Sequence, residues 1–276
     1  MIIRVPATSA NLGPGFDTLG CALAWHAEFR LAAGGSGRPP VDDRHIAWRA
    51  FRHGGGTGPL WVTSPLPMGR GVGSSAAMRV GGLAAAAVQR HGAGVDLRDP
   101  SLGLLAAASE LEGHADNAAA ALFGGVVVTA AGEVVALPAV PDLVVTVWIP
   151  PQVSRTRASR KALPPAVPFA DAAFNVSRVA LLVAGLATGR LDVLRLGTQD
   201  RLHQDARLEA YPGTRQALEA ALDAGALAAW LSGSGPSMAC WCRPGETDGV
   251  VDALPAQGRT LVLDIDRSGT VVDLHD

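Results

Sequence analysis

The sequence contains very little lysine, cysteine or net charge, and each scarcity excludes a class of protein. Lys161 is the one lysine among 276 residues, which excludes a Walker A phosphate loop because that motif carries its own lysine. Three cysteines do not build a disulfide framework, and Cys240 and Cys242 lack further cysteines or histidines at the spacing of a zinc site. The net charge of -2 offers no basic face, so we expect no nucleic-acid partner.

Long apolar runs are missing as well. No stretch of 18 residues is both apolar and free of charge, and no basic segment leads into an apolar run near residue 1. We therefore expect a cytoplasmic protein with no membrane partner. Hydrophobic residues make up 48% of the chain and charged residues 17%, which is enough apolar material for a folded protein with a real core.

A glycine-rich loop dominates what is present, with the sequence PMGRGVGSSAA from Pro67 to Ala77. Its alternating glycines let the backbone turn tightly and approach a ligand. Ser74 stands where a helix N-cap belongs, ahead of the strong helix former at 76–87. Backbone N–H groups at a helix start favour phosphate, although a plain turn that begins a helix is the alternative. The expected strand at 60–63 supports the phosphate site, whose counter-charge would come from Mg²⁺, arginine or backbone.

Two polar clusters flank this loop in the sequence. Asparagine occurs three times only, and Asn11 lies with Asp17 in a turn-rich segment that suits a small polar ligand or, alternatively, an ordinary turn. The second cluster is EGHADN at 112–117. Either Glu112 or Asp116 fits a Mg²⁺ site, whereas a solvated helix end is the alternative, and His114 alone is more typical of a structural role.

The pattern of elements predicts an α+β protein in two parts. Strands and helices mix without a repeating βαβ rhythm, which argues against a doubly wound sheet. We place one domain at 1–149, with the phosphate loop, and a second at 150–276. The second begins with a basic segment that is either a mobile loop or a lid over an anion, and we expect a single helix over 191–208.

Several motifs together resemble the homoserine kinases of the GHMP kinase superfamily. The segment PATSANLGPGFDTLG at 6–20 is specific to homoserine kinases, and the phosphate loop is shared across the superfamily. Further matches are GHADN at 113–117, LFGG at 122–125 and LSGSGPS at 231–237. The likeness runs nearly from end to end.

The resemblance implies ATP-dependent phosphorylation of L-homoserine in threonine biosynthesis. It implies a fold with an N-terminal domain like the second domain of ribosomal protein S5 and a ferredoxin-like C-terminal domain. Mg²⁺ would accompany ATP, the active site would lie between the domains, and a homodimer is plausible by analogy. The alternatives are another GHMP kinase of the mevalonate or shikimate type, or a nucleotide-binding regulator without catalysis.

The matched positions carry roles over to this chain. Asp17 suits the ammonium group, and two arginines suit the carboxylate because a guanidinium binds it through two bonds. Asp116 and Arg160 are the catalytic candidates, Asp116 as a general base unless it only orients Asn117. Ser75 and Glu112 are the implied Mg²⁺ ligands. The implied homoserine contacts are Asn11, Asp17, Asn117, Thr156, Arg160 and Arg207, and the implied ATP contacts are Pro67, Gly69, Arg70, Gly71, Val72, Gly73, Ser74, Ser75 and Ala76.

Overall fold

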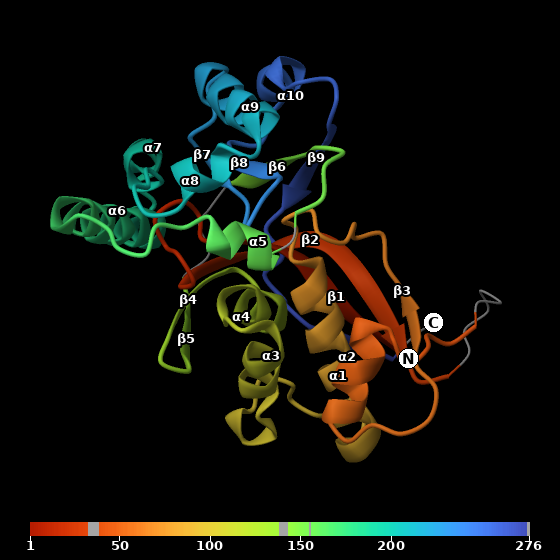
Figure 1. Cartoon of the computed structure of the whole chain (residues 1–276). Coiled ribbons are helices and arrows are strands. Elements are labelled where there is room, and N and C mark those ends of the chain that lie inside the picture. The colour runs from red at the N-terminus through yellow and green to blue at the C-terminus, as the bar shows by residue number, and fades with distance from the viewer. Residues whose placement is uncertain (33–38, 138–142, 155, 275–276) are drawn as a thin grey trace.

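The computed structural model describes residues 1–32, 39–137, 143–154 and 156–274, without the side chains of 156–158. Two antiparallel sheets organise the chain (Figure 1). The first sheet has the order β10-β1-β2-β4-β5, with β3 also paired to β2. Its strands are β1 (Ile2–Ala10), β2 (Leu19–Arg30), β3 (Trp61–Thr63), β4 (Val126–Ala130), β5 (Glu133–Ala136) and β10 (Val271–Asp273).

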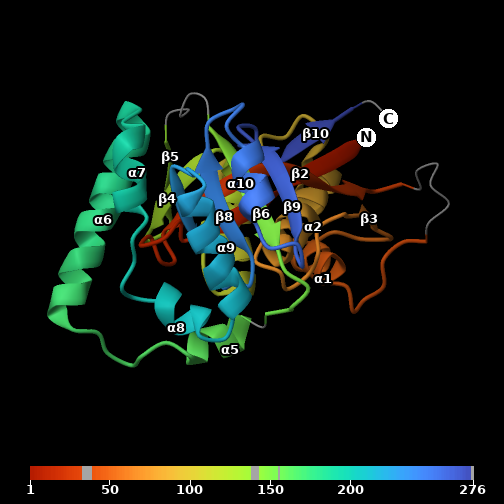
Figure 2. The same ribbon diagram turned by 90° about the horizontal axis from the view of Figure 1, so that it is seen from above.

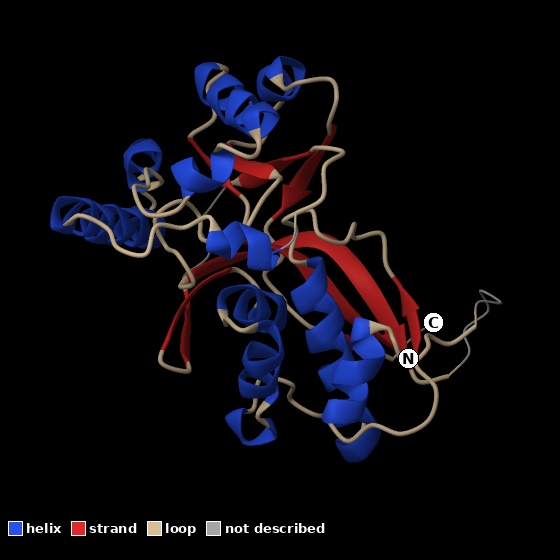
Figure 3. Ribbon diagram, viewed as in Figure 1, coloured by secondary structure: helices blue, strands red, loops and turns tan. Residues whose placement is uncertain are grey.

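Helices cover one face of the first sheet (Figure 3). They pack closely because small residues line their contacts. Gly81 lies against the ring of Phe29, and Gly82 lies against the carbonyl oxygen of Ala47. Alanine, which keeps the helix without adding bulk, fills much of the buried surface. The helices are α1 (Ile46–His53), α2 (Ser74–His91), α3 (Leu104–Glu112) and α4 (Asp116–Phe123), with the short 3₁₀ helix η1 (Pro100–Leu102) before α3.

The second sheet has the order β7-β8-β6-β9. Two helices, α9 (Pro212–Asp223) and α10 (Asp248–Ala253), lie on its outer face (Figures 1 and 2). This order of a βαββαβ unit is the ferredoxin-like arrangement. One continuous core joins the sheets, and it includes the Trp230 and Trp241 rings, which contact one another at an interplanar angle of 53°. The strands are β6 (Val144–Ile149), β7 (Ala228–Leu231), β8 (Met238–Cys242) and β9 (Arg259–Asp264).

The remaining helices lie in the chain between β6 and β7, two strands of the second sheet. Among the described residues, α6 (Phe169–Thr188) is the one helix whose length and composition pass the test for a membrane span, with a mean hydropathy of 1.4. One such helix is weak evidence for a membrane span, because a helix of a protein outside the membrane can pass the same test. These helices are α5 (Thr156–Lys161), α6 (Phe169–Thr188), α7 (Leu194–Gly197) and α8 (Gln204–Leu208), with the 3₁₀ helix η2 (Leu191–Val193) before α7.

The predicted α+β class and two-part GHMP kinase fold are confirmed. The domain boundary between 149 and 150 stays a prediction and does not coincide with the division between the sheets, since β6 lies in the second sheet and β10 in the first. The expected helix over 191–208 is wrong. Asp200 breaks it, because its carboxylate accepts the backbone N–H groups of residues 202–204.

Candidate active site

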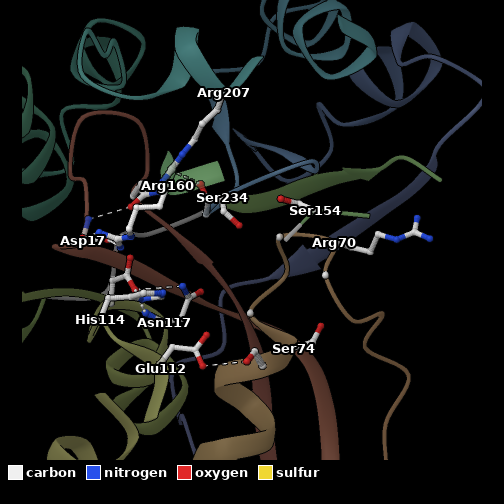
Figure 4. Close-up of a pocket in the computed structure, with 17 residues that line it drawn as sticks. Asp17, Arg70, Ser74, Glu112, His114, Asn117, Ser154, Arg160, Arg207 and Ser234 are labelled. Atoms are coloured by element: carbon white, nitrogen blue, oxygen red, sulfur yellow. Dashed lines mark hydrogen bonds and ion pairs between the residues drawn. The ribbon is translucent and has the colours of Figure 1, made fainter. Parts of the chain in front are cut away.

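A pocket lies where the phosphate loop meets the turn at 232–236, α5 and α8 (Figure 4). In that view Asp17, Arg160 and Arg207 lie on one side, Arg70 and Ser154 on the other, with Glu112 and Ser74 below. The pocket brings most predicted site residues together. Those that line it are Asn11, Asp17, Gly69, Arg70, Gly71, Gly73, Ser74, Ser75, Glu112, Asp116, Asn117, Arg160 and Arg207.

Four predicted residues stand apart from the lining. The carbonyl oxygen of Pro67 accepts a hydrogen bond from the Ser74 hydroxyl, and that of Val72 accepts one from the Thr8 N–H group. Ala76 is buried in α2. These three support the loop rather than face the pocket. The side chain of Thr156, at the start of α5, lies outside the described residues.

The phosphate loop needs its glycines. Gly69, Gly71 and Gly73 all have positive φ, and a Cβ atom on Gly73 would stand 1.7 Å from the Thr8 hydroxyl oxygen. The prediction of Ser74 as N-cap is wrong, because Gly73 occupies that position and the Ser74 hydroxyl instead donates to the Pro67 carbonyl at 2.7 Å. No side chain caps α2 within the described part of the chain, which leaves its first N–H groups available to an anion.

The second glycine turn clamps this loop. The Ser232 hydroxyl lies 2.7 Å from that of Ser9 and donates to the Gly71 carbonyl at 2.5 Å. The Ser237 hydroxyl donates to the carbonyl of Arg70. The motif at 231–237 therefore fixes the phosphate loop through serine hydroxyls that reach it from the second sheet.

Ser75 and Glu112 face one another across the base of the pocket. The Ser75 hydroxyl donates to Glu112 Oε2 at 3.0 Å. Neighbouring ligands of an octahedral Mg²⁺ lie roughly 2.9 Å apart, given metal–oxygen distances of about 2.1 Å, and both atoms are the hard oxygens that this metal prefers. The pair thus fits a magnesium site. The Arg79 guanidinium also contacts both oxygens, and burial lowers its pKa.

Opposite charges meet on the other side of the pocket. Arg160 donates to the two carboxylate oxygens of Asp17 at 2.8 and 2.9 Å. Asn11 holds this loop, because its side-chain oxygen accepts from the Asp17 N–H group and its amide donates to the Gly233 carbonyl. Asn11 and Asp17 both have positive φ, an uncommon conformation outside glycine that concentrates at functional sites.

Arg207 lies deeper, with 3% of its surface exposed. Its Nη1 donates to the Gly233 carbonyl at 3.2 Å, whereas its Nε has no partner among the described atoms. Arg207 and Arg160 both lie against the ring of Phe16. Burial and, after it, the charge of Arg160 lower the pKa of Arg207. Two neighbouring guanidinium groups of this kind form a site suited to a carboxylate.

Asp116 is buried, and its side chain interacts with both His114 and Asn117. Its Oδ1 lies 2.6 Å from His114 Nδ1 and accepts the backbone N–H of Asn117 at 2.7 Å. The Asn117 amide oxygen in turn accepts from the Thr8 hydroxyl. Burial alone would lower the pKa of His114, but the hydrogen bond and charge of Asp116 outweigh it and raise that pKa. This arrangement favours the alternative in which Asp116 orients Asn117.

Sequence reasoning missed three contributors to the site. His114 takes part directly, and with Asp17 and Asp116 it forms a cluster whose ligand atoms lie within 4.8 Å of one another. Ser154 is buried, its N–H donates to the Gly69 carbonyl at 2.7 Å, and its hydroxyl has no partner among the described atoms. Arg79 follows Ser75 by one helical turn, and that spacing was the signal that could have found it.

Comparisons with known proteins show the family to which the chain belongs. The family models described as "GHMP kinases N terminal domain" and "GHMP kinases C terminal" match residues 44–125 and 182–260. The homoserine kinase of Thermus thermophilus is 41% identical over 95% of both chains, and that of Moorella thermoacetica is 43% identical over 88% of this chain and 87% of its own. The crystal structure of homoserine kinase from Cytophaga hutchinsonii superposes with a TM-score of 0.85 at 29% identity, covering 99% of this chain and 97% of that one. The chain therefore belongs to the homoserine kinases of the GHMP kinase family.

Proposed function

We propose that this protein transfers the terminal phosphoryl group of ATP to the side-chain hydroxyl of L-homoserine, as a step of threonine biosynthesis. The observation that carries the proposal is a single pocket with a phosphate loop on one side and the charges for a zwitterion on the other. Its relatives named homoserine kinase, matched over most of their length, support the same activity.

The amino acid is recognised by groups that pair with each other in its absence. Asp17 offers a carboxylate to the ammonium group, and Arg160 with Arg207 offers guanidinium groups to the carboxylate. The Asp17–Arg160 pair has 33% and 44% of its side chains exposed, so its opening costs little. When homoserine binds, its ammonium and carboxylate groups form two ion pairs in place of the single Asp17–Arg160 pair. The carboxylate also gives the buried Arg207 an anionic partner.

Transfer depends on holding the hydroxyl against the phosphate and on neutralising phosphate charge. The first N–H groups of α2 and of the glycine loop bind phosphate oxygens. Ser75 and Glu112 would hold Mg²⁺, which would supply positive charge to those oxygens. Asn117, oriented by Asp116 and Thr8, lies at the meeting point of the two sides, where it positions the substrate hydroxyl. A general base is optional in a loose transition state, and Asp116 is the candidate.

Another small-molecule kinase of this fold is the alternative, because mevalonate kinases superpose on the chain at 12–16% identity. The Asp17–Arg160 pair argues against it, since mevalonate and shikimate carry no ammonium group for Asp17. A regulator without catalysis is disfavoured because both metal-site oxygens are present. A cytoplasmic location and a homodimer remain proposals, which cell fractionation and light scattering test.

The deciding experiment is an assay of ADP release with Mg-ATP and homoserine, serine, mevalonate, shikimate and galactose in parallel. We expect turnover with homoserine and none of comparable rate with the others. Turnover with a different alcohol would keep the phosphate loop but overturn the roles of Asn11 and Asp17. If ATP binds but no ADP is released with any of the five compounds, the proposal of a kinase would be overturned in favour of a nucleotide-binding regulator.

A further inference from the structure

Arg79 places a permanent positive charge at the proposed metal site. Ser75 and Arg79 lie four residues apart on α2, so both face the end of α3 that carries Glu112. The guanidinium contacts Glu112 Oε2 and the Ser75 hydroxyl, and Ser75 donates to that same carboxylate oxygen at 3.0 Å. The Glu112 side chain is 11% exposed and that of Arg79 22%, so solvent screens the pair only partly.

The guanidinium therefore contacts the same two oxygens that a magnesium ion would bind. Each oxygen atom offers few lone pairs, and a divalent cation beside a guanidinium meets strong repulsion at this distance. Glu112 carries one negative charge, which Arg79 already balances. Glu112 thus has one carboxylate for two competing cations.

We propose that Arg79 holds Glu112 in the nucleotide-free protein and competes with Mg²⁺ for it, so that metal binds firmly only together with nucleotide phosphates. The identity of the nucleotide rests on the proposed function, whereas the competition does not. Phosphate oxygens add ligands to the metal and give the released guanidinium a new anion. The Arg79–Glu112 ion pair also reduces the electrostatic repulsion that an unpaired Glu112 carboxylate would exert on an incoming triphosphate.

The test compares Arg79→Met with Arg90→Met, a matched substitution on α2 whose guanidinium contacts the distant Gly54 carbonyl. Mn²⁺ binding is followed by water-proton relaxation, first with Mn²⁺ alone and then with Mn²⁺ and a non-hydrolysable ATP analogue. We expect Arg79→Met to bind Mn²⁺ alone about tenfold more tightly than the wild type, since a charge-assisted contact is lost from the competing side. Arg90→Met should match the wild type, and Arg79→Lys should fall between.

Two results would overturn the proposal. Unchanged Mn²⁺ affinity in Arg79→Met would show no competition, and weaker affinity would show that Arg79 instead orients Glu112 for the metal. Adding Glu112→Gln to Arg79→Met must abolish the gain, because a retained gain would place the metal elsewhere. Thermal melting of each variant checks its folding. A gain in Mn²⁺ affinity without homoserine kinase activity would leave this inference standing and remove the proposed function.

Discussion

The two sides of the pocket are built from different materials. The proposed phosphate side is built mainly from backbone, with three glycines at positive φ and serine hydroxyls bonded to carbonyl oxygens. The homoserine side consists of charged side chains, of which Asp17 and Arg160 lie 143 residues apart in the sequence. A backbone site cannot adjust without refolding, whereas side-chain pairs can exchange partners. The comparison teaches that the proposed nucleotide side is rigid and that the proposed homoserine side carries exchangeable charge.

The largest effect should follow Gly73→Ala, which tests the rigid side. The new methyl group meets the Thr8 hydroxyl and forces alanine into a left-handed backbone. We expect nucleotide affinity, measured by titration calorimetry, to fall at least about 100-fold, since together the clash and the strain exceed roughly 3 kcal/mol.

The matched control is Gly92→Ala, at the other end of α2, which also has positive φ but open space around it. It should cost about 1–3 kcal/mol of stability and leave nucleotide binding unchanged. Equal losses of nucleotide affinity in both variants would mean that helix stability, and not the loop, controls binding.

Asp17→Asn tests the exchangeable side and should have the next largest effect. Removing the charge leaves the substrate ammonium without its partner, so the KM for homoserine should rise about 10- to 100-fold while the affinity for ATP stays constant. Asp192→Asn removes the carboxylate of an exposed Arg190–Asp192 pair and should change neither value. Equal losses of affinity for ATP and for homoserine would contradict the division of the pocket into two separate sides.

Arg207→Met should raise the KM for homoserine about tenfold, with little change for ATP. The long apolar side chain keeps the contact with Phe16 but removes the guanidinium that awaits a carboxylate. Steady-state kinetics with both substrates measures this. If kcat falls with no change in either KM, Arg207 acts on the transition state and not on substrate binding.

The smallest effect concerns His114, which lies between the two sides. Its raised pKa means that the protonated form is favoured in the fold, so its contribution to stability is present below about pH 6.5 and is lost as pH rises through the raised pKa. The stability difference between wild type and His114→Gln in urea should therefore shrink by about 1 kcal/mol or less from pH 6 to pH 8.5. A difference that stays constant over this range would exclude the charged His114–Asp116 pair.

The same division explains what the sequence could predict. The phosphate loop is a local pattern, and alternating glycines before a helix former imply its conformation directly. Its error was local too, since Ser74 was assigned the cap that Gly73 provides. The strand expected at 60–63 is present as β3.

The rest depends on contacts between distant segments. The Asp17–Arg160 pair and the hydrogen bond from Ser232 to the Gly71 carbonyl join residues more than a hundred positions apart. The local pattern indicated Asp17 as a candidate for binding a small polar ligand, but only the resemblance to homoserine kinases pointed to Arg160 as a substrate contact. The interruption of the helix at 198–203 could not be predicted, because it depends on the Asp200 carboxylate. That carboxylate accepts hydrogen bonds from the His203 N–H group and from the side-chain amide of Asn175 on α6. Helical periodicity carries no information on such a bond.

The pairing of β1 with β10 has a consequence for how the chain is made. Ile2 lies opposite Asp273, so β1 can complete its pairing only after β10 has been synthesised. During synthesis the whole second sheet leaves the ribosome before β10 does. Until then β1 is an open edge, able to pair with another nascent chain. Closing that edge joins β1 to β10 in one sheet, and so makes the first sheet depend on a strand that is synthesised after all the other strands of both sheets.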